Sequence, residues 1–383
     1  MKRKIKKLFR SPGEYIRDYF LNIYPIVLSD RIPEKNDNIF LVNDKNLRWD
    51  NCIERVVLND YLPVEFPIDF VFTHVSSDDI RFQTDFKEHY SNDYQNVTVD
   101  PARFECHEEL RYALRSVFLY APWVRKIHIV VPYDEPLWLD KTHPQISIVK
   151  HDRILPPYAL PTFNSHVIES ALHKIEGLSE RYVYFNDDML LARPTTPEYF
   201  FSGTGLAYTF LSSINLPIGS IDEKLDTPSE WGAKNARNLI SNATGFYVSQ
   251  MIAHTFYPQI KTISEENENR WQDEYKAMRM NKFRSTNDIL CTGFLNPHMA
   301  ILHNKSIPTR TRLFYFNIRH KVAIKYYLAL LAKKGTEQAP MSFCLNDRLH
   351  DDGYGFTNFF NYEKDFLSAY FPDPAPWEKK NYL

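Results

Sequence analysis

Residues 161–193 read PTFNSHVIESALHKIEGLSERYVYFNDDMLLAR, and two elements can be recognised in them. The first is a helix over residues 165–176, whose open amides Asn164 or Ser165 can cap. The second is a short strand over residues 182–185, which is rich in aromatic and β-branched side chains. A helix that leads into such a strand is the repeating unit of an α/β sheet.

The strand ends directly in Asn186-Asp187-Asp188, and this ending indicates chemistry. Ligands of open α/β sheets lie beyond the carboxyl ends of the strands. Two adjacent carboxylates repel each other there unless a cation or a proton intervenes. A divalent metal that holds a diphosphate is one solution and a general base is another, whereas an Asx-turn with solvated acids is the structural alternative.

Further strands are predicted at residues 68–73, 126–131 and 146–149. Their order with the helices predicts an α/β fold with a Rossmann-like, nucleotide-sugar-binding sheet that is flanked by helices. The less regular chain after residue 193 predicts a smaller, mostly helical insertion and C-terminal part. No glycine-rich phosphate loop is present, which excludes the dinucleotide fingerprint and the P-loop.

A second helix is predicted before Pro122, with Arg111 and Arg115 one turn apart on its polar face. Two arginines at this spacing offer forked donors to phosphate oxygens. Plain surface ion pairs with Glu108 are the alternative, and such pairs contribute little to stability.

The 383 residues are 44% apolar and carry a net charge of −2, which allows one large core plus a subdomain, or two domains. The near-neutral balance argues against nucleic acid as the main partner, because nucleic-acid-binding proteins normally have a basic excess. Four scattered cysteines without a CxxC spacing predict reduced thiols in a cytosolic protein.

Six basic residues crowd the first ten positions, with apolar residues between them. Such a segment can lie on an anionic membrane surface, and a solvated tail is the alternative. The sequence contains no apolar run of about 18 residues, and we therefore expect no membrane-spanning helix. We expect a basic, membrane-associating arm and linker over residues 1–65, a catalytic domain over residues 66–350, and a C-terminal tail over residues 351–383 that packs on it.

Four parts of the chain resemble the conserved regions of the Stealth family, the hexose-1-phosphate transferases of bacterial capsule synthesis. They are residues 68–75, residues 103–123 continuing through 160–188, residues 254–288, and residues 344–347. One departure stands in the first region, where the family usually has Trp-Val-Asp and this chain has His74-Val75-Ser76.

The resemblance implies four catalytic residues, which are Glu169, Asp188, His254 and Arg284. Together with the chemistry described above, it gives a set of expected substrate- and phosphate-binding residues, which are Asp69, Arg111, Arg115, Asn164, His166, Asn186, His298 and Asn346. The expected metal ligands are Asp187 and Asp188, and the expected ion is Mg²⁺, with Mn²⁺ as the alternative.

The activity implied by the resemblance is transfer of a hexosamine-1-phosphate, N-acetylglucosamine-1-phosphate above all, from a UDP-sugar to a hydroxyl of the growing capsule chain, with release of UMP. The implied partners are a UDP-N-acetylhexosamine donor, a capsule oligosaccharide acceptor, the anionic inner-membrane surface, and capsule assembly and export proteins. The implied location is peripheral, at the cytoplasmic face of the bacterial inner membrane. Two alternatives stay open, namely a conventional metal-dependent glycosyltransferase that releases UDP and a non-catalytic capsule-assembly scaffold.

Overall fold

A computed structural model describes residues 12–13, 16, 62–75, 79–90, 108–320, 322–347 and 359–382. The predictions for the basic segment at residues 1–10 and for Ser76, Cys52 and Cys106 fall outside these residues.

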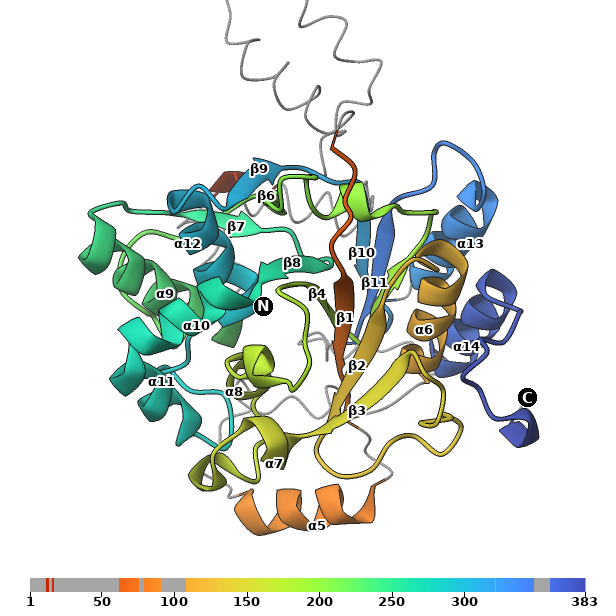
Figure 1. The fold of residues 1–383 in the computed structure, drawn as a ribbon, viewed down its shortest axis with the longest axis horizontal. Coiled ribbons are helices and arrows are strands. Elements are labelled where there is room, and N and C mark those ends of the chain that lie inside the picture. The colour runs from red at the N-terminus through yellow and green to blue at the C-terminus, as the bar shows by residue number, and fades with distance from the viewer. Residues whose placement is uncertain are drawn as a thin grey trace, which may run out of the picture.

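A five-stranded sheet lies at the centre of the molecule, in the order β3-β2-β1-β4-β8 (Figure 1). Its strands are β1 (Ile68–Thr73), β2 (Lys126–Val131), β3 (Ile146–Lys150), β4 (Arg181–Asn186) and β8 (Tyr257–Ile260). The first four are parallel and β8 pairs antiparallel to β4. The predicted α/β sheet is therefore confirmed, and β1, β2 and β4 are almost wholly buried apolar strands of the kind expected between two helical layers.

The register of this sheet brings the polar strand ends to one edge. Thr73 at the end of β1 lies opposite Val130 on one side and Asn186 on the other. The residues that follow β1 and β4 in the chain are therefore neighbours in space.

The structure also contains two separate three-stranded sheets. One has the order β10-β11-β5, with β5 (Met189–Leu191), β10 (Leu313–Asn317) and β11 (Ser342–Asn346). The other has the order β7-β6-β9, with β6 (Ala207–Asn215), β7 (Gln250–Ile252) and β9 (Ser306–Thr309). Because β5 follows β4 after only Asp187-Asp188, the first small sheet begins where the acidic turn ends the central strand.

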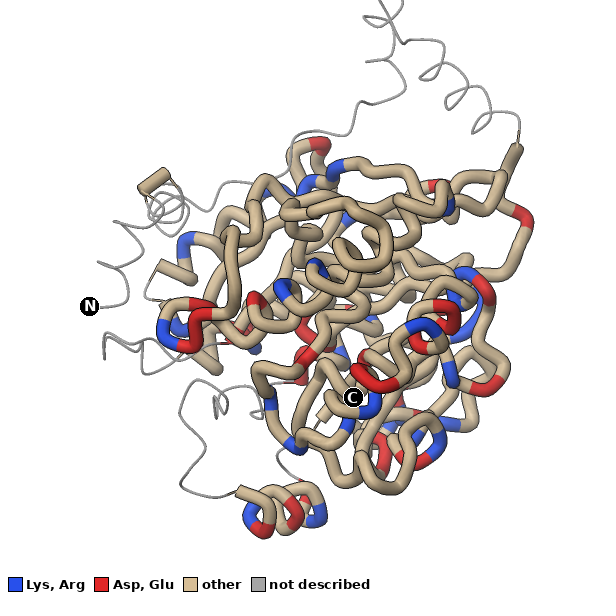
Figure 2. Tube along the Cα trace, turned by 90° about the vertical axis from the view of Figure 1, so that its left-hand side faces the viewer, with Lys and Arg blue, Asp and Glu red and all other residues tan. Residues whose placement is uncertain are grey.

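Helices flank both sides of the sheets, with α6, α13 and α14 on one side and α9 to α12 on the other (Figure 1). The helices are α5 (Ile80–His89), α6 (Glu109–Tyr120), α7 (His151–Ile154), α8 (Ser165–Glu169), α9 (Pro228–Thr244), α10 (Lys261–Arg270), α11 (Gln272–Arg279), α12 (Asn296–Leu302), α13 (Ala323–Lys333) and α14 (Phe359–Tyr370). Short 3₁₀ or π turns occur at Pro157–Ala159, Leu172–Lys174, Pro197–Tyr199, Cys291–Leu295 and Lys380–Tyr382. Lys and Arg are interspersed with Asp and Glu over the described residues (Figure 2).

The helix predicted over residues 165–176 is shorter than its pattern suggests. Asn164 caps it as expected, because its side-chain oxygen accepts from the amide of His166. The helix α8 stops at Glu169, and a 3₁₀ turn follows at Leu172–Lys174. The guanidinium of Arg279 donates to the carbonyl of Ser170 at 2.7 Å and to its hydroxyl at 3.0 Å, so a distant side chain takes the carbonyl that would continue the helix.

No helix among the described residues combines the length and the apolar character that crossing a membrane requires.

Candidate active site

The turn Asp187-Asp188 is the centre of the site. It follows β4 at the carboxyl edge of the central sheet and leads into β5. The carbonyl of Asp188 accepts from the amide of Leu345 at 3.1 Å, which ties the turn to β11. Both strands that hold the turn are buried, so the two carboxylates are fixed by packed backbone and not by a mobile loop.

The carboxyl group of Asp188 lies in an unusual environment. Its Oδ2 accepts a hydrogen bond from the thiol of Cys344 at 3.3 Å, whereas its buried Oδ1 has no hydrogen-bond partner. Burial, followed by the nearby charge of Asp187, raises the pKa of Asp188 to about 7. A carboxyl group placed in this way can hold a proton or accept a cation near neutral pH.

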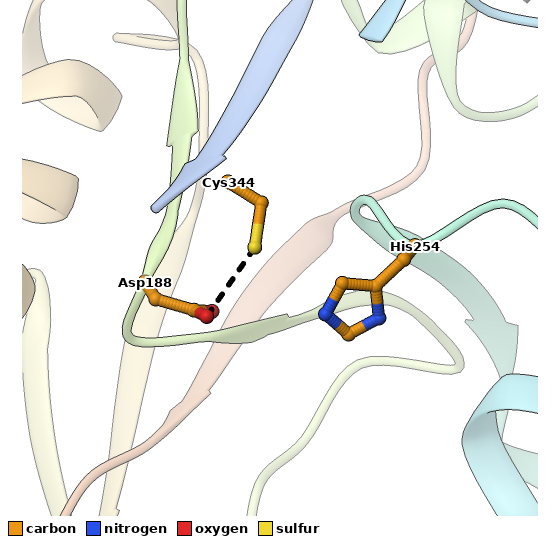
Figure 3. Close-up of side chains that lie close together, drawn as sticks. All are labelled: Asp188, His254 and Cys344. Carbon is orange, nitrogen blue, oxygen red and sulfur yellow. Dashed lines mark hydrogen bonds between the residues drawn. The ribbon is translucent and has the colours of Figure 1, made fainter. Parts of the chain in front are cut away.

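His254 approaches Asp188 from the loop between β7 and β8. The ligand atoms of Asp188, His254 and Cys344 all lie within 4.8 Å of one another (Figure 3). The Nδ1 of His254 is hydrogen-bonded to the hydroxyl of Tyr257 at 3.0 Å, and Figure 3 shows the other ring nitrogen facing Asp188 and Cys344. The ring of Tyr315 packs edge-on against the imidazole, with centroids 5.3 Å apart. The imidazole is thus aimed at the acidic turn by its neighbours.

Asp187 is held by the residue that departs from the Stealth pattern. The Nδ1 of His74 is 2.8 Å from Asp187 Oδ2, and His74 is buried while the Asp187 side chain is 33% exposed. The amide of His74 donates to the carbonyl of Val130 at 2.9 Å, which continues the pairing of β1 with β2 for one more residue. His74 was noted in the sequence because it differs from the usual Stealth tripeptide, but its contact with Asp187 was not predicted.

Glu169 lies at the end of α8 and accepts a hydrogen bond from the hydroxyl of Thr292. Burial, and then the charge of Glu169, raises the pKa values of Tyr184 and Tyr257 well above the usual range. These two rings stack with centroids 6.0 Å apart, and Tyr257 is the partner of His254. The predicted catalytic residues Glu169, Asp188 and His254 therefore gather around one pair of tyrosines.

Arg284 lies at the other end of α8. Its guanidinium donates to the hydroxyl of Ser165 at 2.8 Å. The loop that carries Arg284 is fixed by Asp288, whose carboxylate accepts from the side-chain amide of Asn164 at 2.9 Å and lies 3.0 Å from His166 Nδ1. Asn164 and His166 are fully buried in this contact, so both side chains help to hold the loop that carries Arg284.

Three residues predicted to bind substrate lie away from the turn. Asp69 is at the amino end of β1, fully buried, and accepts hydrogen bonds from Arg125 at 2.8 Å and from the amide of Ser179 at 2.8 Å. Arg111 and Arg115 donate to Glu378 of the C-terminal segment, each with a shortest distance of 2.6 Å. The contacts found for all three are ion pairs and hydrogen bonds within the fold, and their contact with substrate or phosphate stays a prediction.

The remaining predicted residues divide between the site and the scaffold. His298 is buried on α12, where its Nδ1 contacts the carbonyl of Phe294 at 2.8 Å. Asn186 is next to the turn, and its side-chain oxygen accepts from the hydroxyl of Tyr184 at 2.8 Å. Asn346 ends β11, one residue after the amide that binds the turn. Asn186 and Asn346 therefore border the site, whereas the contact of His298 is with the backbone of Phe294 and its part in substrate binding stays a prediction.

A cleft of about 370 Å³ opens beyond the carboxyl ends of β2 and β3. It is lined by Phe82, Asp85, Pro132, Tyr133, Lys150, His151, Asp152, Leu160, Pro161, Thr162 and Phe163. Since β1 lies between β2 and β4, the cleft and the acidic turn share one edge of the sheet, one strand apart.

Comparison with known proteins identifies close relatives. The profile of Stealth protein CR2, conserved region 2, matches residues 103–209. The chain is 36% identical over 375 residues to the capsular polysaccharide phosphotransferase fcs1 of Haemophilus influenzae, covering 96% of this chain and 100% of the relative. It is 35% identical over 350 residues to the capsular polysaccharide phosphotransferase LcbA of Aeromonas hydrophila, covering 90% of this chain and 94% of the relative. A solved structure of the galactosyltransferase LgtC is 13% identical with a TM-score of 0.37, covering 81% of this chain and 98% of that one.

Proposed function

The chain belongs to the Stealth family of capsular polysaccharide phosphotransferases, and from this premise we propose that it transfers a hexosamine-1-phosphate from a UDP-sugar to a hydroxyl of a growing capsule chain. The acceptor oxygen attacks the phosphorus that is bonded to the sugar. The bond from that phosphorus to the bridging oxygen breaks, and UMP leaves with the electron pair. The single observation that supports the proposal most is that His254 lies beside Asp188 in the turn that ends β4, and that both of them and Glu169 lie near Tyr257.

We propose that His254 takes the proton of the acceptor hydroxyl. Its Nδ1 is engaged with Tyr257, and the nitrogen that faces the turn is the one placed to receive a proton (Figure 3). Asp188, the other candidate base, has one oxygen bound to a thiol and the other buried beside Asp187, which suits it better to a cation. Glu169 supports the tyrosine pair that positions the imidazole.

Arg284 is proposed to bind the oxygens of the transferred phosphoryl group. Phosphoryl transfer is catalysed mainly by alignment and by stabilisation of charge, and one preorganised donor can supply about 2.7–4 kcal/mol. The contact of Arg284 with Ser165 and the buried Asn164–Asp288 pair hold this loop near the amino end of α8. The cleft beyond β2 and β3 is proposed for the nucleoside, because aromatic and polar side chains line it on the same sheet edge.

Asp187 and Asp188 fit a hard divalent cation. They supply carboxylate oxygens, which Mg²⁺ prefers, and the buried Oδ1 of Asp188 lacks a hydrogen-bond partner. When bound, Mg²⁺, or Mn²⁺ in its place, would screen the charge of the diphosphate and of the leaving UMP. The protein's own part is to hold the two carboxylates apart, through His74 on one side and Cys344 on the other.

The proposed donor is UDP-N-acetylglucosamine. We infer this donor from a resemblance of the chain, the basic amino-terminal segment and residues 309–319 included, to the single-domain polymerase of the meningococcal serogroup X capsule, which builds chains of N-acetylglucosamine-1-phosphate. The basic segment is proposed to place the enzyme at the inner face of the inner membrane, beside capsule assembly and export proteins. Deleting residues 1–60 should then reduce binding to anionic vesicles and leave turnover in solution, whereas a non-catalytic scaffold would show no turnover in either form.

Two substitutions test the proposed machinery. His254→Ala and Asp188→Asn should each lower the rate of UMP release from UDP-N-acetylglucosamine and a capsule oligosaccharide primer, the first by about 10²–10⁴-fold. His303→Ala and Asp273→Asn are matched controls, because they change the same residue types at the end of α12 and in α11. Both should leave the rate unchanged. Near-normal UMP release by either of the first two variants would remove that residue from the mechanism.

A further inference from the structure

We propose that Asp188, His254 and Cys344 bind a thiophilic divalent cation of the Zn²⁺ class, and that its occupancy inhibits transfer. The binding part stands on the geometry of these three side chains alone. The inhibitory part rests on the proposed function, since it needs Asp188 and His254 to take part in the reaction.

The three side chains come from three separate elements and point to one place (Figure 3). Asp188 is in the turn after β4, His254 is in the loop before β8, and Cys344 is in β11. Their oxygen, nitrogen and sulfur atoms all lie within 4.8 Å of one another, so small side-chain rotations bring them to one cation. The buried, unpartnered Oδ1 of Asp188 is a second sign of a missing ligand at this point.

Neighbouring residues hold the three side chains of this site in place. Cys344 in β11 pairs with Met189 in β5, and the next residue of β11 donates its amide to the carbonyl of Asp188. The strand that carries Cys344 is therefore already joined to the turn that carries Asp188 and to the strand that follows it. The hydroxyl of Tyr257 contacts Nδ1 of His254, which is the outer contact that typically orients a metal-binding imidazole and selects its other nitrogen as the ligand.

The chemistry of the set separates two classes of cation. Mg²⁺ binds oxygen ligands in an octahedral arrangement and gains nothing from a thiolate. Zn²⁺ takes carboxylate oxygen, imidazole nitrogen and thiolate sulfur together, and three protein ligands leave its fourth position open. Asp187, whose Oδ2 is engaged with His74, remains outside the Zn²⁺ set.

Binding would change the site in a defined way. The thiol proton of Cys344 is released to solvent, and its hydrogen bond to Asp188 is replaced by two bonds to the cation. Asp188 is then withdrawn from Mg²⁺, and His254 can no longer accept a proton. Occupancy by Zn²⁺ therefore opposes the reaction that Mg²⁺ supports.

Cobalt(II) is the probe of binding, because thiolate coordination to it gives a charge-transfer band in the near ultraviolet. The test uses the full chain with Cys52→Ser and Cys106→Ser and without Mg²⁺ or substrate. We expect one equivalent of Co²⁺ to give the band and Cys344→Ser to lose it. Cys291→Ser, which removes the other buried thiol of the described residues, should keep it. Absence of the band in the parent protein, or its survival in Cys344→Ser, would overturn the proposal.

A second variant guards against misfolding of the serine variant. His254→Ala should keep the charge-transfer band, since the thiolate remains, and should change the visible bands of Co²⁺, since one nitrogen ligand is lost. Visible bands identical to those of the parent protein would exclude His254 from the set and overturn the three-ligand site.

Inhibition is measured separately as UMP release with and without Zn²⁺ at fixed Mg²⁺. We expect Zn²⁺ to suppress the rate and excess Mg²⁺ to restore part of it. A Co²⁺ band without inhibition by Zn²⁺ would overturn the inhibitory part. A protein that shows the band and releases no UMP under any condition would instead contradict the proposed function, so the two failures are distinguishable.

Discussion

Replacing His74 by Leu removes the donor that holds Asp187 and leaves the rest of the β1 end in place. The His74 Nδ1 to Asp187 Oδ2 contact measures 2.8 Å, and the histidine side chain is only 5% exposed. A hydrogen bond to a charged group contributes about 1.5–3 kcal/mol. Since the Asp187 side chain is 33% exposed, water can replace part of this hydrogen bond in the variant. We therefore expect the variant to lose about 1–2 kcal/mol of the stabilisation that the contact gives to Asp187.

This loss corresponds to a decrease of roughly 5–30-fold in kcat/KM for the UDP-sugar, if Asp187 acts in the transition state. The assay is initial-rate UMP release, with the melting temperature recorded for each variant. His74→Asn is the matched control, because the asparagine amide nitrogen lies where Nδ1 lies in histidine, and it should recover most of the activity. A His74→Leu enzyme as active as the parent, or a His74→Asn enzyme no better than His74→Leu, would refute the role given to this contact.

Three other predictions concern the scaffold and the second layer of the site. Glu378→Gln should lower the free energy of unfolding by about 3–5 kcal/mol, because it leaves buried Arg115 and partly buried Arg111 without the carboxylate of Glu378. Asp373→Asn, at an exposed position, is the control and should not lower it, and a loss below about 1 kcal/mol for Glu378→Gln in urea unfolding would contradict the prediction. Burial alone would raise the pKa of Glu378, but hydrogen bonds from Arg115, the amide of Ala375 and Arg111 outweigh it and lower the pKa. The difference in unfolding free energy between the parent and Glu378→Gln should therefore have its full size above about pH 4.5 and become smaller as the pH falls below that value. A difference that becomes larger in acid would contradict a lowered pKa of Glu378. Thr292→Val removes the hydroxyl that donates to Glu169 and should lower kcat/KM by about tenfold or more, with recovery in Thr292→Ser; equal rates in all three proteins would separate Glu169 from the reaction.

The central sheet could be predicted from the sequence because its signals are local. The strand of residues 182–185 and its acidic ending are continuous in the chain, and the rule that ligands lie at the carboxyl edge of a parallel sheet places Asp187 and Asp188 correctly at that edge.

The partners of charged side chains could not be predicted in the same way. The periodicity of α6 put Arg111 and Arg115 on one face, but their carboxylate belongs to Glu378, 263 residues beyond Arg115. The end of α8 likewise depends on Arg279, which takes the carbonyl of Ser170 from more than one hundred residues away. No local pattern contains such contacts.

Cys344 was missed as a member of the site for a related reason. Its neighbourhood depends on the register of β11 against β5 and on the two-residue length of the acidic turn, and both are properties of the folded sheets. His74 could be noticed in the sequence, because it replaces the first residue of the tripeptide that the family usually has. Its partner, Asp187, is seen only in the folded structure.

In the proposed reaction, the sugar is transferred together with its phosphate. The most direct measurement is the nucleotide released when the full chain acts on a UDP-N-acetylhexosamine and a capsule oligosaccharide, separated by ion-exchange chromatography. We expect UMP in amounts equal to the phosphodiesters formed. UDP as the released nucleotide, with a product that contains no new phosphodiester, would contradict it.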